Sequence, residues 1–342
     1  MYRLVNWTNL HTKIHRTIRT RHLFEHSSRL LVAVSGGQDS LCLGKLLLDL
    51  QSKWGWDLAI AHCDHRWRSD SQANAEHVEN IAKNWGIPFY LQTTTEVLNG
   101  EAAARHWRYQ ALTTIAGENN YHYIVTGHTQ SDRAETLLYN LMRGSGADGL
   151  QSLTWQRSLA NNILLVRPLL EVNRLETGQF CQDFHLPVWE DSTNQDLKYP
   201  RNRIRQELIP YLRENFNSQV ESNLAQTAEI LQAEVEYLQI AAEELRDKAS
   251  APLLKQTPAS SCFRLNRRVL QTAPKALQRR VIRSLLQLVL PQAPGFDQIA
   301  KLTGLITAPN LSKTDPFPGG AIAQVQGDWI VLLTSSSPVH GR

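Results

Sequence analysis

Cysteine is scarce in this chain of 342 residues, and the few cysteines are scattered. They stand far apart, with no C-x-x-C pair among them, at Cys42, Cys63, Cys181 and Cys262. This spacing argues against a disulfide framework and favours reduced thiols, as in a cytoplasmic protein. It also argues against chemistry that needs paired cysteines, such as sulfur transfer through an iron–sulfur cluster or a persulfide.

Long apolar runs are absent as well. The nearest is LLQLVL at 285–290, far short of the roughly 18 residues that a membrane-spanning helix needs, so no membrane partner is expected. The composition, 42% hydrophobic and 20% charged, is typical of a globular protein, and the length suits about two domains. No internal repeat or low-complexity segment is evident.

Acidic residues are unevenly distributed. Residues 217–248 hold seven acids and two bases, a net charge of −5, so the whole-chain charge of +4 leaves +9 for the remainder. This balance favours a polyanionic partner. The first 28 residues contain a single acid, Glu25, which would suit a transit peptide or a basic amphipathic helix. We favour the helix, because the stretch leads directly into an apolar run.

From residue 29 to about 170, short apolar runs alternate with longer amphipathic stretches. The runs RLLVAV, DLAIAH, PFYLQT, HYIVTG and NILLVRPL are separated by expected helices at 40–51, 70–85, 101–117 and 131–142. This alternation predicts an α/β fold with a parallel sheet covered on both faces. Ligands of such sheets bind at the carboxyl ends of the strands.

After Pro210 the pattern changes. The stretch 217–249 contains no glycine or proline and spaces apolar residues by three and four, which predicts one long amphipathic helix. We place the domain boundary near residue 213, giving domains over 1–213 and 214–342. A helix at 274–290 and a hairpin turning at Gly327-Asp328 make the second a smaller helical or α+β domain.

The sequence SGGQDS at 35–40 directly follows the first apolar run, and it lacks the Gly-Lys-Ser/Thr ending of a Walker A loop. Gly36 and Gly37 have no Cβ, so their backbone N–H groups can approach phosphate oxygens closely. The positive end of the next helix and the hydroxyls of Ser35 and Ser40 are directed to the same place. The pattern favours a nucleotide-phosphate site over a plain strand-to-helix turn.

Asp39 has a different role in this loop. An anion is a poor direct contact for phosphate, but it is a good ligand for a phosphate-bound Mg²⁺.

The stretch AHCDHRWR at 61–68 gathers histidine, cysteine and aspartate at the end of an expected strand. A zinc site is disfavoured, because successive side chains of a strand point to opposite faces and the four ligands would diverge. We interpret the stretch as a wall of the nucleotide pocket, formed by His62, with Arg68 free for phosphate. In EAAARHWRY, Arg105 and Arg108 lie three residues apart on a helix, and a solvated surface is the alternative for them.

The segment GHTQSDRAE at 127–135 carries a second acidic group. If the helix begins near Thr129, His128, Asp132 and Glu135 form one stripe at the mouth of the pocket. A histidine and two carboxylates can hold Mg²⁺ or accept a proton from a nucleophile. A carboxylate that only stabilises the helix N-terminus is the alternative for Asp132.

Two basic groups point to a polyanion. Arg201 and Arg205, with Arg203 between them, share a helical face and could grip one phosphate of ATP or RNA. In the second domain a basic helix face opposes the apolar residues Leu277, Val281, Leu285 and Leu288, and it consists of Lys275, Arg279 and Arg283. RNA contact and plain solvation fit this face about equally well.

Together these motifs resemble the tRNA(Ile)-lysidine synthetases of the PP-loop ATP pyrophosphatase superfamily. The resemblance rests on SGGQDS, the AHxxHxxR strand end, AARxxRY, GHxxxDxxET with LxRGSG, RPLL at 167–170, and DSTNxDxxYxRNxIRxxxIP at 191–210. It covers residues 29–213, and the chain looks like the short form of the family. Family members often have two adjacent acids where this chain has Ser131-Asp132, so we assign the catalytic role to Asp132 alone.

The resemblance implies a PP-loop (adenine nucleotide alpha hydrolase-like) domain and a two-step ligation. ATP with Mg²⁺ adenylylates the C2 oxygen of the wobble cytidine of the CAU-anticodon isoleucine tRNA and releases pyrophosphate, and the ε-amine of free L-lysine then attacks C2 and expels AMP. The implied catalytic residues are Asp39, Arg105, His128, Asp132 and Arg205. The implied ATP-binding residues are Ser35, Gly36, Gly37, Gln38, Asp39, Ser40, His62, Arg68 and Gly127, with Asp39 and Asp132 as ligands of Mg²⁺ and Arg201 and Arg203 as RNA contacts. Lys275, Arg279 and Arg283 lie outside the resemblance, and we expect them to contact RNA only because they form a basic helix face.

Three alternatives stay open at this stage. A PP-loop tRNA thiolase would share the glycine loop, a glutamine-fed amide synthetase would need a partner glutaminase, and a non-catalytic RNA-binding module would keep a dead nucleotide site. The isolated cysteines disfavour the first, and the intact Ser35, Gly36, Gly37, Asp39 and Asp132 disfavour the last. The lysine pocket and the oligomeric state, a homodimer included, are not specified by the sequence.

Overall fold

The computed structural model describes residues 7–67, 69–96, 98–190, 196–250 and 262–333. The chain forms two compact units, Met1–Gln232 and Ala233–Arg342. Among the described residues, no helix is both long and apolar enough to cross a membrane.

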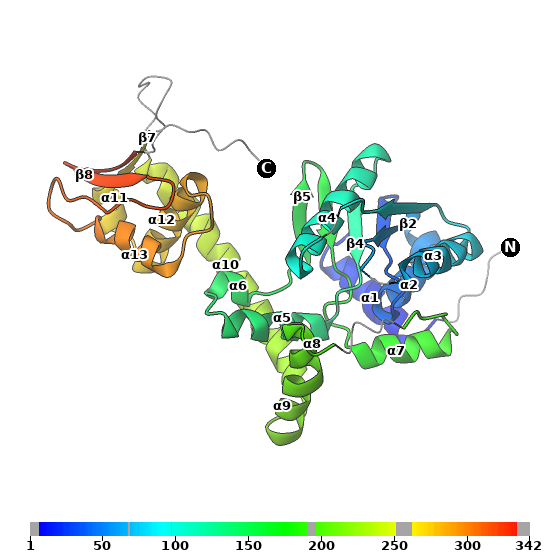
Figure 1. Ribbon diagram of the computed structural model, residues 1–342. Helices are drawn as coiled ribbons and strands as arrows, with labels where there is room; N and C mark the ends of the chain where they lie inside the picture. The colour runs from blue at the N-terminus through cyan, green and yellow to red at the C-terminus, as the bar shows by residue number, and fades with distance from the viewer. Residues whose placement is uncertain (1–6, 68, 97, 191–195, 251–261, 334–342) are drawn as a thin grey trace. The chain divides into compact units, whose positions relative to one another are not determined.

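The first unit is built on a sheet that has six strands within the described residues (Figure 1). The strands are β1 (Arg29–Ala33), β2 (Asp57–Asp64), β3 (Phe89–Thr93), β4 (Tyr123–Thr126), β5 (Gln156–Ala160) and β6 (Ile163–Val166). Their order is β3-β2-β1-β4-β6-β5, and all neighbours are parallel except β5 and β6. The predicted parallel α/β domain is confirmed, with one antiparallel edge strand that the sequence did not indicate.

Helices cover both faces of this sheet. The helices before the sheet's last strand are α1 (Asn9–Thr20), α2 (Gln38–Trp54), α3 (Ser71–Trp85), α4 (Glu101–Glu118), α5 (Gln130–Met142) and α6 (Ala147–Leu150). Residues of α1, α2 and α3 pack in one core with Leu30, Val32 and Ile60. Residues of α4 pack in a second core with Leu31, Ala59 and Ile124. Alternate residues of β1 therefore enter opposite cores, as expected for a buried parallel strand.

The amphipathic helix favoured for the N-terminal stretch is present as α1. Its residues Ile14 and Ile18 are fully buried, and Thr8 caps its first turn. The helix packs on α2, which begins directly after the glycine loop.

After β6, the described secondary structure of the first unit consists of helices. These are α7 (Arg174–Asp183), α8 (Pro200–Arg203), a π-helix η2 (Ile204–Leu208), α9 (Ile209–Asn215) and the start of α10 (Val220–Ala249). A small core joins η2, α9 and the start of α10 to α5 through Leu138, Ile204, Ile209 and Leu224. Because this part of α10 packs on the first unit, the two compact units divide inside α10. The domain boundary at 213/214 remains a prediction.

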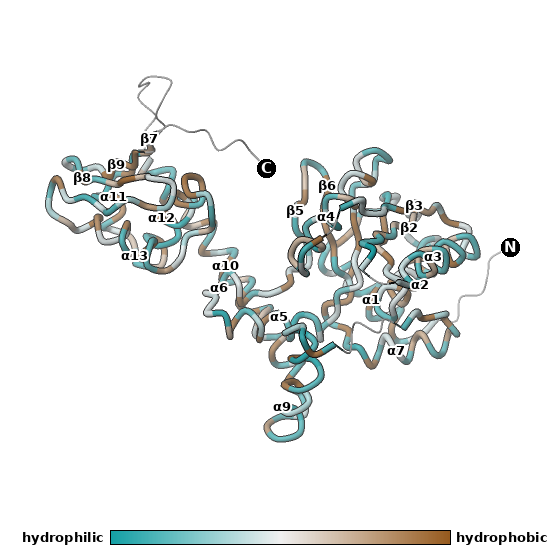
Figure 2. Tube along the Cα trace, in the orientation of Figure 1, coloured by the Kyte–Doolittle hydropathy of each residue, from teal (hydrophilic) through white to brown (hydrophobic). Residues whose placement is uncertain are grey.

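The second unit has its own small core. It contains the later turns of α10, the strands β7 (Cys262–Asn266), β8 (Ile322–Gln326) and β9 (Trp329–Leu333), and the helices α11 (Arg267–Gln271), α12 (Lys275–Val289) and α13 (Phe296–Gly304). The predicted hairpin is formed by β8 and β9, which are antiparallel and turn at Gly327 with φ +59°. Figure 2 shows the apolar residues of β9 as a brown stretch, whereas the helices around it alternate teal and brown.

One detail of α12 differs from the expectation. Leu288, which we placed on the apolar face, is 71% exposed, whereas Ile282 and Leu286 are fully buried. The buried stripe of α12 keeps the predicted Val281 and Leu285 and extends to Ile282 and Leu286 in place of Leu288, as the helix packs in one core with α13 and the small sheet.

Candidate functional site

The glycine loop (35–40) and the turn at Gly127-His128 meet at the carboxyl ends of β1 and β4. These adjacent strands are the place where the order of the sheet reverses, since β2 and β3 lie on one side of β1 and β4 lies on the other. Ligands of open α/β sheets bind at such a switch point. Gly127 brings the two segments together, because a Cβ on it would lie 2.8 Å from the carbonyl oxygen of Asp39. Only glycine permits this approach.

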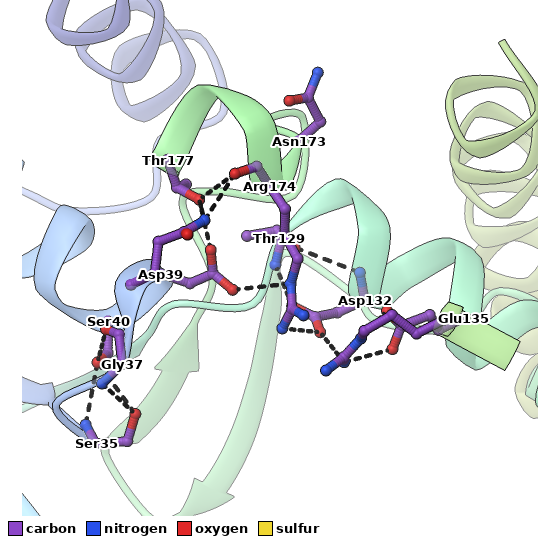
Figure 3. A network of polar contacts seen from close by, with 12 residues as sticks. Ser35, Gly37, Asp39, Ser40, Thr129, Asp132, Glu135, Asn173, Arg174 and Thr177 are labelled. Atoms are coloured by element: carbon purple, nitrogen blue, oxygen red, sulfur yellow. Dashed lines mark hydrogen bonds and ion pairs between the residues drawn. The ribbon is translucent and has the colours of Figure 1, made fainter. Parts of the chain in front are cut away.

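The loop is held by hydrogen bonds of its own serines, shown in Figure 3. Ser40 Oγ donates to the Gly37 carbonyl at 2.9 Å and accepts from the Ser35 backbone amide at 3.1 Å. Gly36 has φ +88°, in the left-handed region that favours glycine, and a Cβ there would lie 2.5 Å from Asn74 Oδ1. Gly37 precedes the first residue of α2 and so stands at the positive end of that helix.

Asp39 lies in the first turn of α2 and faces α7. Its Oδ1 accepts a hydrogen bond of 2.6 Å from Thr177 Oγ1, and its Oδ2 lies 3.1 Å from Arg174 Nε. Burial raises the pKa of Asp39 above its ordinary value, the nearby charge of Asp132 adds to this shift, and the Arg174 guanidinium opposes it. A further cation placed beside Asp39 would therefore lower this pKa and stabilise the ionised carboxylate.

Asp132 serves two purposes at once. Its Oδ2 caps α5, accepting from the Thr129 backbone amide at 2.8 Å and from Thr129 Oγ1 at 2.9 Å. Its Oδ1 faces Arg174 and Arg205, each with a guanidinium nitrogen at 3.6 Å. Although burial pushes its pKa upward, the surrounding positive groups, Arg174 first, hold the pKa of Asp132 below its ordinary value. The helix-cap interpretation of Asp132 thus applies to Oδ2, whereas a role of Oδ1 in the reaction stays a prediction.

Arg205 is the second arginine near Asp132, and it also contacts Glu135. It forms a two-point ion pair with Glu135, with both N–O distances at 2.7 Å, and Glu135 is only 3% exposed. Arg205 lies in the π-helix η2, an irregularity that is frequent at functional sites. Burial raises the pKa of Glu135, and the Arg205 pair opposes this shift.

His128 is near the acidic Asp132 and also near the basic residues Arg105, Arg108 and Arg167. Its Nδ1 is hydrogen-bonded to Thr126 Oγ1 at 2.9 Å. Burial, followed by the positive charge of Arg167, lowers the pKa of His128 to about 3, with smaller contributions from Arg105 and Arg108. The imidazole is therefore neutral at physiological pH.

A pH dependence of stability follows from this shift. Between pH 6.5, the ordinary pKa of histidine, and about 3, the unfolded chain binds a proton at His128 that the folded chain does not. Stability must therefore fall as the pH falls through this window, by up to about 1.4 kcal/mol per pH unit. We expect His128→Asn to flatten the fall in the free energy of unfolding between pH 6.5 and 4.5 in urea titrations. An unchanged slope would contradict a neutral His128.

The other residues predicted for the site have different positions. Gln38 donates through Nε2 to the Arg174 carbonyl at 2.7 Å and so holds α7 against the loop. His62 is buried in β2, where its Nδ1 donates to the Val34 carbonyl at 2.7 Å behind the loop. Arg105 stacks on Tyr109. Arg68, like residues 191–195 of the DSTN motif, lies outside the described residues.

The predicted RNA contacts are dispersed. In the first unit Arg201 stacks on Tyr139 of α5, and the exposed Arg203 pairs with Glu207 at 3.4 Å. In the second unit Lys275 and Arg279 are exposed on α12, and Arg279 stacks on Phe296, whereas Arg283 is half-buried.

Two residues of the cluster had not been singled out from the sequence. Arg174 and Thr177 come from α7, more than a hundred residues from Asp39, and contact it directly. The one local signal was the capping box of Asn173 and Glu176, which marks the start of a helix after the last parallel strand. The pattern shows that a helix begins there, but not which way it faces.

Comparisons with known proteins bear on this geometry. A family model described as a PP-loop domain matches residues 7–212. The tRNA(Ile)-lysidine synthase of Nostoc sp. is 70% identical over 332 residues, which cover 95% of this chain and 97% of that protein. The tRNA(Ile)-lysidine synthase of Synechocystis sp. is 51% identical over 330 residues, again 95% and 97%.

A solved structure shares the fold at low identity. The U34-tRNA thiolase NcsA of Methanococcus maripaludis matches with a TM-score of 0.56 and 14% identity, covering 65% of this chain and 78% of that one. The likeness supports the PP-loop architecture and nothing more. With the two synthases matched at such identity over nearly their whole length, the chain belongs to the tRNA(Ile)-lysidine synthase family.

Proposed function

We propose that this chain ligates lysine to C2 of the wobble cytidine of the CAU-anticodon isoleucine tRNA, using ATP and releasing AMP and pyrophosphate. The observation that carries the proposal is the meeting of the glycine loop with Asp39, Asp132, Arg174 and Arg205 at the switch point of the sheet. Membership of the tRNA(Ile)-lysidine synthase family favours lysine ligation over the other reactions that a PP-loop site could perform.

ATP would lie over the glycine loop. The amides of Gly36 and Gly37 and the start of α2 are suited to the charge that develops on pyrophosphate as the bond to the α-phosphate breaks. Arg174 and Arg205 lie beside the two carboxylates, and their guanidinium groups would stabilise the negative charge that develops on pyrophosphate.

Asp39 and Asp132 would hold Mg²⁺. Their carboxylates lie on either side of Arg174, and the charge of Asp132 raises the pKa of Asp39, a repulsion that a cation would relieve. Mg²⁺ is usually bound by one or two carboxylates together with substrate phosphates, so the donor set fits. When bound, the ion would neutralise charge on the departing pyrophosphate.

Lysine would enter beside α5. Its ε-amine must lose a proton before it attacks C2, and the ionised Asp132 Oδ1, which is not used by the helix cap, is the acceptor that we assign. A neutral His128 adds no positive charge to repel the incoming cation.

The tRNA would bring an unstacked anticodon base to this pocket. Arg201 and Arg203 near the site and Lys275, Arg279 and Arg283 on α12 are the phosphate contacts that we propose. We assign the reaction to the cytoplasm. Cys42, Cys63 and Cys181 are free thiols in the structure, and they would stay reduced there. A homodimer remains a hypothesis for its assembly.

Pyrophosphate release tests the proposal without lysine. We expect release from ATP that depends on Mg²⁺ and on a tRNA with an unmodified CAU anticodon, and little release with a tRNA that has a different wobble base. Equal release with both tRNAs would contradict recognition of the wobble cytidine.

A further inference from the structure

Glu229 of α10 joins three parts of the first unit at one carboxylate. Its Oε1 lies 2.7 Å from Arg21 Nη1, at the end of α1. Its Oε2 lies 2.5 Å from Arg133 Nη1 of α5 and accepts a hydrogen bond of 2.9 Å from Trp155 Nε1. Both oxygens thus accept from donors that lie far away in the sequence.

Arg133 is the buried member of this network. Only 2% exposed, it has Glu229 as its sole carboxylate partner within the described residues, and its Nη2 donates to Gln232 at 3.2 Å. A buried guanidinium needs such a partner, because an unpaired buried charge is strongly destabilising. The surrounding donors hold the pKa of Glu229 below its ordinary value despite partial burial, so the carboxylate is ionised at neutral pH.

The network borders the catalytic helix directly. Arg133 follows Asp132 in the sequence, and successive residues of a helix are about 100° apart around its axis. The Arg133 side chain therefore leaves α5 on a different side from Asp132, so that the pairing of Arg133 with Glu229 fixes how far α5 is turned. That rotation decides where Asp132 Oδ1 and Glu135 face.

We propose that Glu229 is a positioning residue for lysine ligation, which orients Asp132 and Glu135 by anchoring α5 through Arg133. This inference rests on the proposed function of the acidic cluster. Stability alone would need only a filled and neutral interior at this place, whereas positioning needs the directional bonds that both carboxylate oxygens make here.

The test is steady-state kinetics of lysidine formation by the full chain carrying Glu229→Gln, at a temperature where circular dichroism shows the variant folded. The amide keeps the volume and one acceptor oxygen but loses the charge. We expect kcat to fall about 10-fold to 100-fold, as for small misplacements of reacting groups. The KM for tRNA should change less than kcat, because Glu229 itself contacts Arg21, Arg133 and Trp155 and none of the proposed RNA contacts.

Two further variants separate positioning from a purely structural role. The double variant Arg133→Met with Glu229→Leu removes both charges and fills the space, so it should fold while kcat stays low. Glu234→Gln, an exposed acid on the same helix, is the matched control and should leave kcat unchanged. Recovery of kcat in the folded double variant, or a normal kcat in Glu229→Gln, would overturn the proposal. Absence of lysidine formation by the unaltered chain would instead overturn the proposed function.

Discussion

Asp39→Asn is expected to reduce pyrophosphate release from ATP by about 10³-fold or more, while tRNA binding persists. Asparagine keeps the shape and can still accept from Thr177, but it removes the charge that faces Arg174 and that would hold Mg²⁺. Release is measured with a coupled phosphate assay, and tRNA binding by filter retention at one fixed salt concentration.

The matched control for this variant is Asp183→Asn. Asp183 is an exposed aspartate at the end of α7, where it accepts a hydrogen bond from Gln179 of the same helix, so both pyrophosphate release and binding should be unchanged. Release at the normal rate in Asp39→Asn would remove Asp39 from the chemistry. No release by the unaltered chain, with tRNA binding intact, would favour the RNA-binding module instead.

Asp132→Asn is expected to lower lysine transfer by about 10³-fold, more than it lowers pyrophosphate release. The asparagine oxygen can still cap α5 by accepting from the Thr129 amide, so the helix start should be kept. What is lost is the charged oxygen between Arg174 and Arg205, which we assign to the proton of the lysine amine. Labelled lysine in tRNA and pyrophosphate are measured in the same reaction.

Thr129→Ala separates the two purposes of Asp132. This change removes the side-chain half of the cap and should cost about 1 kcal/mol of stability. Because the charge of Asp132 remains, lysine transfer by the folded protein should stay within a few-fold of normal. If Thr129→Ala reduced transfer as strongly as Asp132→Asn, Asp132 would act as a helix cap and not in the reaction.

The parallel core of the fold could be predicted from the sequence because it is locally encoded. Buried parallel strands are continuous apolar runs, and each is followed here by a helix whose start or end carries glycine or a capping residue. The edge strand Gln156–Ala160 escaped because its side chains are half-buried or exposed, so no alternation marks it. The strand Cys262–Asn266 was missed because it pairs with β9, which lies more than sixty residues later, and no turn signal links the two.

The site could be predicted only in part. SGGQDS and GHTQSD were recognised because the backbone geometry requires glycine at Gly36 and Gly127, and a required glycine is visible in the sequence. The contact of Asp39 with Arg174 has no such sequence signal, because it is made by the packing of α7 on α2. The pairing of Arg205 with Glu135 likewise depends on the packing of η2 with α5.

Glu229 illustrates the same limit. In the sequence it is one of seven acids in 217–248, indistinguishable from its exposed neighbours. Only the folded chain separates it, by placing Arg21, Arg133 and Trp155 around its carboxylate.

The most direct test of the central claim is incorporation of labelled lysine into tRNA that carries an unmodified CAU anticodon, with ATP and Mg²⁺ present. Only label that survives mild alkali is counted, because alkali removes aminoacyl esters. We predict stable, ATP-dependent label that is lost in Asp132→Asn. Absence of stable label with this tRNA would contradict lysine ligation, and the switch-point site would then have to activate a different acceptor.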